Sequence, residues 1–444
     1  MVNFEFFKLS ELAEVIVSGV DKKSKPGQKE VRLCNFTDVY YNWAVTSSLF
    51  DSFMVATAKD SEIETLSIKK GYVALTKDSE TRYDIGISTY IADEFDDVIL
   101  GYHCALIKPN EKVLRGKYLN CLLQTQYART YFANNAKGSG QRYSLTQDCL
   151  NDMKIPLPMK NGRVDMDYQE KVGNLFSSID RKIEINQQIN RNLEELARLI
   201  YDYWFVQFDF PDKNGKPYKS SGGKMVWNEK LKRDIPAGWQ TARVRDVILP
   251  IERGISYSSD EITDPNGTPM INLACFDKKG NYRTGEFKYF TGKFKNEDKV
   301  YPYDMLIACT DLTQKADIIG TPIFAPTESP FYVFSMDLIK ISPIRSSDKQ
   351  FLYYYLKHPA FHHYIKPFAS GTTVKHLRVD GLLEYPIFLP DEKIRDVFAD
   401  VMEPIRRKIA DNSSQCVELS KMRDYLLPLL MNGQVSVKSN GRSK

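Results

Sequence analysis

The chain has 444 residues, with 61 Lys and Arg against 57 Asp and Glu, so its formal charge of +4 is close to neutral. This balance does not by itself indicate a nucleic-acid binder, and any basic surface must be local or shared with a partner. The seven Cys lack C-x-x-C spacing, the N-terminus lacks a basic leader, and no apolar run approaches the roughly 20 residues that a bilayer requires. We therefore expect a cytoplasmic protein with reduced thiols, neither secreted nor membrane-spanning.

A chain of this length predicts two or three domains, and internal repeats favour two. One repeat begins FFKLSELAEVIVSG and the other GWQTARVRDVILPIERG, so that Gly19 matches Gly254 at an offset of 235 (254 − 19 = 235). Each repeat continues with a buried strand that runs into a polar loop, GYVALTKDSETRYD at 71–84 and YDMLIACTDLTQKAD at 303–317. In this comparison Asp78 corresponds to Asp311.

Each repeat then has a predicted helix, over 114–136 and over 347–369, followed by a loop of small residues, KGSGQRYSL and SGTTVKHL. Short strands follow, MKIPLP and EYPIFLP, and small insertions explain why the offset drifts along the chain. The same elements in the same order indicate an old duplication. Residues 20–70 and 255–300 differ between the repeats, which suits one scaffold that presents two different recognition surfaces.

A long helix is predicted over residues 172–204, where a seven-residue step gives Val172, Ile179, Asn186, Leu193 and Ile200, with Leu175, Ile189, Leu196 and Tyr203 as a companion seam. The same spacing recurs 226 residues later (398 − 172 = 226) in Phe398, Ile405, Asn412, Leu419 and Leu426. We expect the two helices to pair, with Asn186 opposite Asn412, because a buried Asn is satisfied best by another Asn. The alternative is two unrelated amphipathic core helices. Pro404 is expected to kink the second helix or to mark the end of its first turn.

The central stretch NLEELARLIYDYWFVQFDFPDKNGKPYKSSGGKMVWNEKLKRDIPAGW and the terminal stretch LSKMRDYLLPLLMNGQV resemble the specificity subunits of Type I restriction-modification systems. The resemblance covers nearly the whole chain. It implies a non-catalytic subunit with two target recognition domains, each reading one half of a split sequence in double-stranded DNA. It also implies two antiparallel helices that set the unread spacer and dock two modification (methyltransferase) subunits, in an assembly joined by restriction (motor and nuclease) subunits. S-adenosylmethionine, ATP and Mg then belong to the partners, and this chain binds no cofactor or metal.

The expected fold class is α+β, with two pseudo-symmetric α/β target recognition domains separated by two long antiparallel helices that form an intramolecular coiled coil. The expected divisions are 1–165 for the first recognition domain, 166–206 for the central spacer helix, 207–238 for a connector, 239–390 for the second recognition domain, 391–432 for the C-terminal spacer helix and 433–444 for a tail.

For DNA contact we expect the loops after the buried strands and the small-residue loops, because short hydroxyl, amide and cationic side chains reach base edges and phosphates. In the first domain these are Thr76, Lys77, Asp78, Ser79, Thr81, Arg82, Ser139, Gln141 and Arg142. In the second they are Thr310, Asp311, Thr313, Gln314, Lys315, Thr372, Thr373 and Lys375. A basic set suits phosphates: Lys22, Lys23, Lys25, Lys278, Lys279 and Arg283. The alternative is that all of these are solvated surface residues.

Large apolar side chains are more numerous at the helix ends than one seam needs, which predicts a partner surface. Its residues are Tyr201, Trp204, Phe205, Leu426, Leu427 and Leu430. The alternative is that they pack against the chain's own domains.

A catalytic function is not indicated. His358, His362 and His363 have helical spacing, but no Cys or acid within that helix completes a metal set. The glycine-rich cofactor loop and the Asn-or-Asp-Pro-Pro-aromatic element of a methyltransferase do not occur, and Asp212 with Asp277-x-Lys279 is only a faint nuclease pattern. Two competing hypotheses remain, an assembly scaffold that binds proteins and no DNA, and a self-contained nuclease.

Overall fold

The computed structural model describes residues 2–140, 142–263, 266–277, 280–283, 285–313 and 315–437, and only the backbone of Ser139 and Thr263. The chain divides into two compact units, of which the first comprises Met1–Glu184 and Glu418–Lys444 and the second Ile185–Val417. Each unit contains a mixed domain of strands and short helices together with parts of two long helices. None of the described helices is both long enough and apolar enough to cross a membrane.

The first unit is built on a five-stranded sheet of order β2-β10-β6-β8-β4, which is antiparallel except between β4 and β8. A second sheet has the order β5-β3-β9, and a third, β1-β13-β14, leads the chain into the first long helix. The bounds of these strands are Asn3–Lys8 (β1), Ala13–Val17 (β2), Lys29–Cys34 (β3), Ala44–Val45 (β4), Met54–Ala58 (β5), Val73–Thr76 (β6), Ser88–Ile91 (β8), Val98–Leu100 (β9), Cys104–Pro109 (β10), Lys154–Lys160 (β13) and Arg163–Val164 (β14). Short helices lie between them, at Leu9–Leu12 (α1), Phe36–Tyr40 (α2), Asp60–Leu66 (α3) and Gln147–Asp152 (α6).

The second unit has a four-stranded sheet of order β18-β27-β23-β25 and a five-stranded sheet of order β19-β21-β20-β26-β22. Their strands are Glu252–Arg253 (β18), Ile262–Thr263 (β19), Thr268–Ile271 (β20), Lys288–Phe290 (β21), Lys299–Val300 (β22), Met305–Ala308 (β23), Pro322–Phe324 (β25), Tyr332–Phe334 (β26) and Leu338–Ile341 (β27). Two smaller pairs of strands also belong to this unit. They are Met225–Asn228 (β15) with Arg233–Pro236 (β16), and Gln240–Arg243 (β17) with Pro386–Leu389 (β30). The short helix Val379–Leu383 (α10) precedes β30.

Each of the two predicted medium-length helices is broken in the structure, so the prediction of single helices was wrong. The pieces are Gly116–Leu123 (α4) and Gln126–Asn135 (α5) in the first unit, and Lys349–Lys357 (α8) and Pro359–Ile365 (α9) in the second. Thr125 caps α5, its hydroxyl accepting from the backbone N–H of Ala128 at 3.4 Å. Pro359 occupies the first turn of α9, and a proline restricts the residue before it to extended backbone, so α8 ends there.

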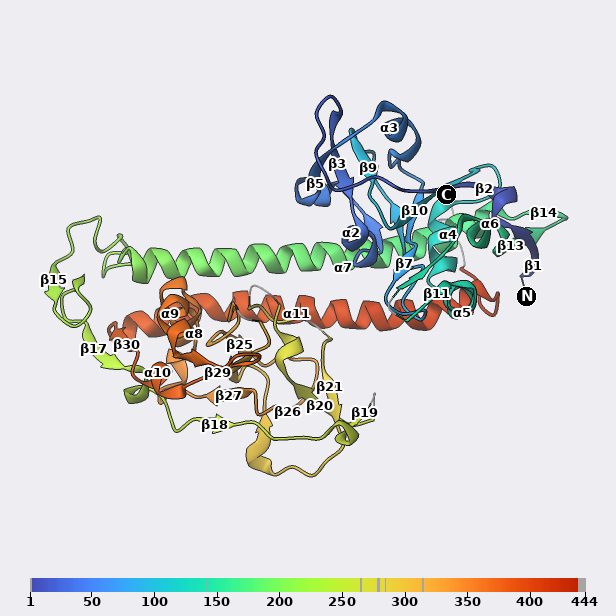
Figure 1. Cartoon of the computed structure of the whole chain (residues 1–444). Helices are drawn as coiled ribbons and strands as arrows, with labels where there is room; N and C mark the ends of the chain where they lie inside the picture. Colours follow the sequence, from blue (N-terminus) through green and yellow to red (C-terminus); the bar gives the residue numbers. More distant parts are fainter. Residues whose placement is uncertain are drawn as a thin grey trace, which may run out of the picture. The chain divides into compact units, whose positions relative to one another are not determined.

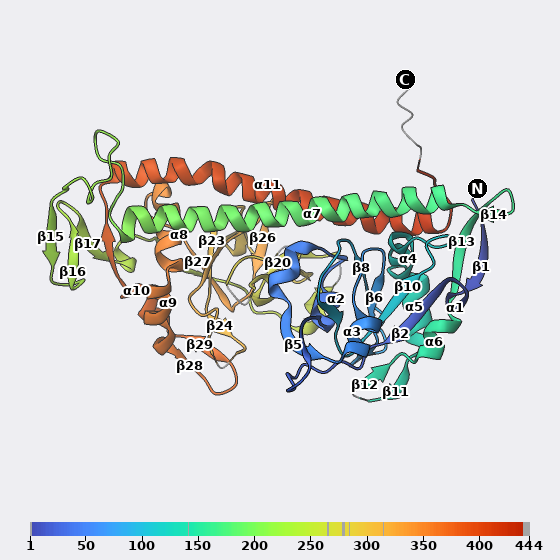
Figure 2. The ribbon, with the colours of Figure 1, turned by 90° about the horizontal axis from the view of Figure 1, so that it is seen from above.

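Two long helices pair in antiparallel fashion within each unit, as expected (Figures 1 and 2). They are Met166–Tyr201 (α7), which continues into a π-helical turn at Asp202–Val206, and Glu392–Met431 (α11). In the first unit the Tyr168 hydroxyl donates to the Leu430 carbonyl at 2.6 Å. In the second unit Arg406 donates to Glu194 at 2.7 Å. Early residues of α7 therefore pair with late residues of α11, and late residues of α7 with early ones of α11, so the two helices are antiparallel.

A layer of buried amides joins the helices in the second unit, but not with the expected partners. Asn186 and Asn412 are each 1% exposed. Asn186 Nδ2 donates to Gln415 Oε1 at 3.2 Å, and Asn412 Nδ2 donates to Asn190 Oδ1 at 2.9 Å. The predicted contact between Asn186 and Asn412 was wrong. In a parallel pair of helices, equivalent positions of the seven-residue repeat face each other. In an antiparallel pair, the first core position of one repeat faces the second core position of the other, and Gln415 occupies such a second position.

Pro404 does not end the second long helix, which runs through it and through Pro428 to Met431. A proline inside a helix costs about 3 kcal/mol. Phe398 and Met402 lie on the same helix and are completely buried, and their packing offsets that cost.

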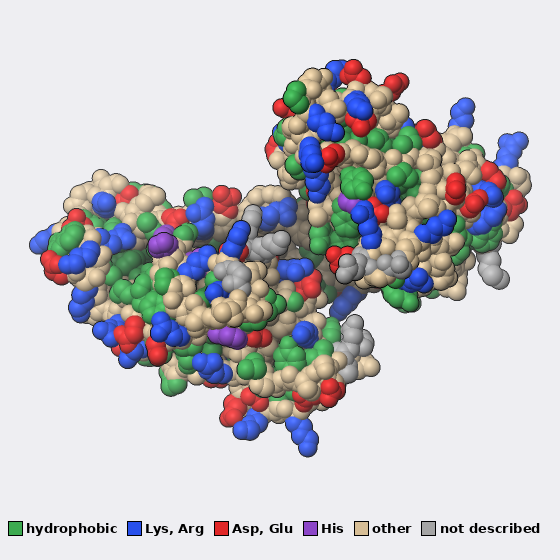
Figure 3. All heavy atoms as spheres, in the orientation of Figure 1, with side chains coloured by type: hydrophobic (Ala, Val, Ile, Leu, Met, Phe, Trp, Pro, Cys, Tyr) green, Lys and Arg blue, Asp and Glu red, His purple; other side chains and the backbone are tan. Residues whose placement is uncertain are grey.

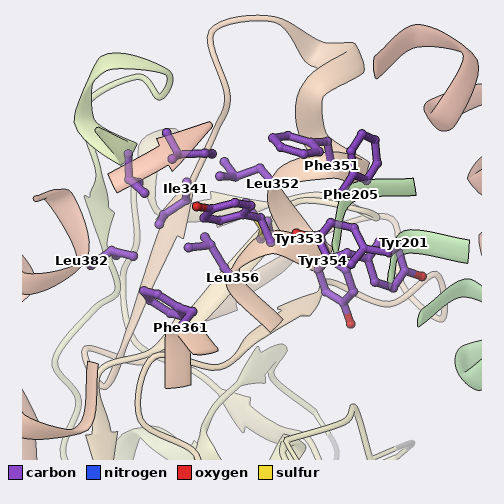
Figure 4. Close-up of a cluster of buried hydrophobic side chains, with 14 of the residues drawn as sticks. Tyr201, Phe205, Ile341, Phe351, Leu352, Tyr353, Tyr354, Leu356, Phe361 and Leu382 are labelled. Carbon is purple, nitrogen blue, oxygen red and sulfur yellow. The ribbon is translucent and has the colours of Figure 1, made fainter. Parts of the chain in front are cut away.

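Aromatic side chains at the C-terminal end of α7 and in the π-helical turn after it lie in the core of the second unit (Figure 4). The Phe205 ring centre lies 4.9 Å from those of Phe351 and Phe398, and Tyr201 stacks on Tyr354 at 6.0 Å. Tyr201, Trp204 and Phe205 are therefore buried, as are Leu427 and Leu430 in the first unit, while Leu426 is half-buried. The prediction that the five buried residues form an exposed partner surface was wrong, because the domain of the same unit covers them, and for the half-buried Leu426 it stays a prediction.

Phe205→Ala should lower the free energy of unfolding by about 3–5 kcal/mol, because it opens a cavity between two other aromatic rings. Tyr203→Ala is the matched control, since Tyr203 lies in the same helical turn with 40% of its surface exposed. Its effect should stay within about 0.5 kcal/mol. Urea unfolding followed by tryptophan fluorescence measures both, and equal losses would contradict the assignment of Phe205 to the core.

Candidate nucleic-acid interface

A small three-stranded sheet in each unit brings together the two loops that the sequence singles out (Figures 1 and 2). In the first unit its order is β11-β12-β7, and in the second it is β24-β29-β28. The strands are Asp78–Ser79 (β7), Lys137–Ser139 (β11), Arg142–Ser144 (β12), Thr310–Asp311 (β24), Ala369–Ser370 (β28) and Lys375–Leu377 (β29). The loop after the buried strand thus pairs with the small-residue loop in both units.

Backbone hydrogen bonds give the exact correspondence between the two small sheets. The Lys77 N–H donates to the His103 carbonyl at 2.9 Å, and the Cys309 N–H donates to the Asp337 carbonyl at 2.8 Å. Lys77 therefore corresponds to Cys309, and Asp78 corresponds to Thr310. The sequence comparison, which aligned Asp78 with Asp311, was shifted by one residue.

Asp78 is the centre of a charged cluster in the first unit. It is 7% exposed, and its Oδ2 lies 2.6 Å from His103 Nδ1, 3.1 Å from Lys77 Nζ and 3.4 Å from Arg142 Nη2. Burial acts to raise the pKa of this carboxyl, but hydrogen bonds from Ser144, His103 and Lys77 outweigh burial and lower the pKa to about 2. The carboxylate is therefore charged at neutral pH and organises its neighbours.

The exposed side of this cluster carries Arg142 and Tyr102. The Arg142 side chain is 59% exposed, and its Nη2 lies 3.5 Å from the Tyr102 hydroxyl. Lys77 Nζ lies 5.7 Å from the centre of the Tyr102 ring. Sequence reasoning missed Tyr102 and His103, although the short GYHC segment between two buried strands indicates a tight turn, and His103 has a φ of 71°.

The second unit has the same backbone but different side chains at these positions. Met336, which corresponds to Tyr102, is 54% exposed, and the half-buried Val374 stands where Arg142 stands in the first unit. Asp311 is 2% exposed, and its carboxylate accepts from the backbone N–H groups of Thr313 at 2.7 Å and Ile318 at 2.9 Å. It shapes the loop and does not face solvent.

The predicted DNA-contact residues fall into three groups. Exposed are Lys22, Lys23, Lys25, Thr81, Arg82, Arg142, Arg283, Thr313, Lys315, Thr372 and Thr373, and half-buried are Lys77, Ser79 and Lys375. Buried, and therefore wrong as contact residues, are Thr76, Asp78, Thr310 and Asp311. Gln141, Lys278, Lys279 and Gln314 lie outside the described residues, as does the side chain of Ser139.

Thr76 and Thr310 are buried for a local reason. The Thr76 hydroxyl accepts from the backbone N–H of Ile87 at 3.1 Å, and Thr310 Oγ1 lies 3.5 Å from His376 Nδ1. The Thr76 hydroxyl holds the loop backbone in place, which is a common use of threonine at the end of a strand, and the Thr310 hydroxyl contacts the ring of His376 on the neighbouring strand.

The histidines of the second unit do not form a metal centre. His358 caps α9, its Nδ1 accepting from the Ala360 N–H at 3.2 Å, and burial lowers the pKa of His358 and of His362. Within the part of the chain that the structure describes, no three His, Cys, Asp or Glu residues are placed to hold a metal ion.

Lysine and arginine side chains are interspersed with acidic ones over the face seen in Figure 3. Positive charge is thus not gathered into one large patch on this face, and the group around Asp78 in the first unit is a local cluster of charges.

The family model of the Type I restriction modification DNA specificity domain matches residues 1–195 and 236–419 of this chain. The chain belongs to this family. The chain is 25% identical over 414 residues to the Type I restriction enzyme HindI specificity subunit of Haemophilus influenzae, covering 83% of this chain and 87% of that one. It is 24% identical over 376 residues to the Type I restriction enzyme MjaIX specificity subunit of Methanocaldococcus jannaschii, covering 83% and 78%.

The specificity-subunit fold is also found by structural comparison. The crystal structure of the Type I restriction-modification system S subunit from M. genitalium aligns with a TM-score of 0.56 and 13% identity, covering 97% of this chain and 96% of that one. At this identity the likeness establishes a shared fold, and the duplicated α+β architecture with paired helices is that of a specificity subunit.

Asp78→Asn should destabilise the protein by about 1–3 kcal/mol at neutral pH, because it removes the charged acceptor that Lys77, His103, Arg142 and Ser144 share. The folded-state pKa of Asp78 lies below its unfolded value, so this stabilisation is fully present above about pH 4 and is lost as pH falls towards about 2. Urea unfolding of both proteins between pH 3 and pH 7 measures the difference. A difference that grows as the pH is lowered would contradict the assigned charge state.

Proposed function

We propose that this chain is the DNA-reading subunit of a Type I restriction-modification complex, in which each unit reads one half of a split target. The observation that carries the proposal is the duplicated small sheet, which presents different side chains on one backbone within a chain of the specificity family. Hydroxyl, cationic and aromatic groups on exposed loops are those that proteins use to contact phosphates and base edges.

The two half-sites should differ in sequence. The first unit presents Arg142, Tyr102 and Lys77 around a buried carboxylate, whereas the second presents Met336 and Val374 at the corresponding positions. A guanidinium recognises hydrogen-bond acceptors, and apolar side chains contact the thymine methyl group. Methyl transfer and cleavage then belong to the partner subunits, together with S-adenosylmethionine, ATP and Mg.

The test is to purify the chain with its methyltransferase partner and to map the methylated sites over a whole genome. We expect a split, asymmetric sequence with a constant unread spacer. Exchange of residues 239–390 for the corresponding domain of another family member should alter only one half of this sequence. An assembled complex with no sequence preference would indicate an assembly scaffold instead. A change in both halves of the target would contradict the proposal that each unit recognises one half.

The paired helices also offer a surface for protein partners, made of other residues than those first predicted. Leu196, Leu199 and Tyr203 on α7 are 47%, 50% and 40% exposed, although two of them belong to the predicted companion seam. On α11, Met422 is 51% exposed and Tyr425 is 70% exposed, each 226 residues after its counterpart (422 − 196 = 226 and 425 − 199 = 226). The duplication has therefore kept an exposed apolar face in each unit.

A groove runs beside each of these faces, lined at corresponding positions. In the first unit a groove of about 310 Å³ is lined by Asp84, Ser88, Gln124, Arg129 and, on α11, Asp424. In the second a groove of about 600 Å³ is lined by Asp317, Thr321, Lys357, His362 and, on α7, Arg198. The same surface occurring twice fits two copies of one partner, and we assign this partner as the methyltransferase subunit.

Leu199→Asp should remove one methyltransferase copy from the complex, and Leu199→Asp with Tyr425→Asp should remove both, because a charge in an apolar contact is left unpaired. Mass determination by light scattering gives the stoichiometry. Lys182→Asp, at an exposed position of α7, is the control and should retain both copies. Full stoichiometry in the double variant would exclude these faces as the docking surface.

A further inference from the structure

We propose that Arg142 reads a guanine in the half-site of the first unit, and that Asp78 is the residue that positions it. The inference deepens the function proposed above and rests on it. It follows from the hydrogen-bonding arrangement of four side chains, which come from three segments of the chain and meet at the exposed edge of the small sheet.

The Arg142 guanidinium is held from one side only. Nη2 lies 3.4 Å from Asp78 Oδ2, 3.5 Å from the Tyr102 hydroxyl and 3.0 Å from His103 Nδ1. The 2.6 Å distance between His103 Nδ1 and Asp78 Oδ2 requires the proton of Nδ1 to point at the carboxylate, so Nδ1 cannot also accept from Arg142. The Asp78 carboxylate, which is itself buried, therefore orients both the His103 N–H and the Arg142 guanidinium.

The remaining donors of Arg142 are available to a ligand. Among the described residues, the hydrogen bonds of the guanidinium all use Nη2, and the side chain is 59% exposed. A guanidinium carries five N–H donors in one plane, and two of them belong to Nη2. One Nη2 N–H points to the side of Asp78 and Tyr102. The other forms a fork with the adjacent N–H of Nη1 or Nε, and this fork remains for outside acceptors. A planar group whose orientation is set before binding favours a ligand with acceptors at fixed positions.

Guanine fits this requirement better than the other bases. Its major-groove edge has two adjacent acceptors, O6 and N7, which match the guanidinium fork, whereas adenine has a donor beside N7. A phosphate also offers oxygen acceptors. However, the Asp78 carboxylate offsets part of the positive charge of Lys77 and Arg142, which weakens the attraction of the cluster for a phosphate anion and has a much smaller effect on a neutral base.

The second unit has no such group at the corresponding positions. Val374 replaces Arg142, and Thr310 replaces Asp78. The guanine preference should therefore be confined to the half-site that the first unit reads.

The experiment uses the complex of the full chain with its methyltransferase, and a library of DNA targets that carries all four bases at every position. Arg142→Lys keeps the charge but loses the fork, and should reduce the preference for guanine at one position by about tenfold or more. Asp78→Asn should reduce the same preference at the same position. Arg163→Lys is the control, because Arg163 is an exposed arginine of the same unit on β14, outside the small sheet, and it should leave every preference unchanged.

Three results would overturn the inference. They are an unchanged preference in Arg142→Lys, a uniform loss of affinity for all targets with a weaker salt dependence, and a wild-type half-site whose affected position is not guanine. The uniform loss would identify a phosphate contact. A wild-type complex with no split target would instead overturn the proposed function. Thermal unfolding of each variant, matched to the wild type, ensures that the selectivity changes come from folded protein.

Discussion

The antiparallel pairing of α7 with α11 is the constraint on which the rest of the structure depends. In each unit the domain packs on parts of both helices, so that Val172 shares a core with Leu427, and Phe205 shares one with Phe398. The buried amides between the helices restrict their register, because a slipped helix would leave Asn186 or Asn412 without a partner, at a cost of about 1–3 kcal/mol for each group. The domains are thus attached to a helix pair whose alignment is costly to change.

Duplication explains how one backbone carries two different surfaces. Backbone hydrogen bonds define the small sheet in both units, and these bonds do not depend on side-chain identity. Side chains at its exposed edge can therefore diverge without loss of the fold, from Arg142 and Tyr102 in one unit to Val374 and Met336 in the other. The exposed faces of the helices have stayed apolar in both units, with Leu199 in one and Tyr425 in the other, which supports the proposal that they bind two copies of one partner.

Much of the fold could be predicted, and the misses have identifiable causes. The long helices follow from a seven-residue period, and the small sheets join loops that were expected to act together. The breaks at Thr125 and Pro359 were missed, although a capping threonine and a proline are local signals. The misassigned contact residues Thr76 and Thr310 carry a hydroxyl that suits both a DNA contact and a contact within the chain, which is made with the Ile87 backbone and with the His376 ring. Residue type does not distinguish these two uses.

The sequence by itself determined the duplicated order of elements and the two long helices, because periodicity and spacing are properties of a chain read in one dimension. The resemblance of its central and C-terminal stretches to known specificity subunits indicated the family. Only the tertiary structure decided which apolar residues are covered, placing Tyr201 and Phe205 in the core and leaving Leu199 exposed. It also decided that Asp78 meets Arg142, which lies 64 residues away in the chain. Burial and hydrogen bonding depend on neighbours brought together by folding, and those neighbours are distant in the sequence.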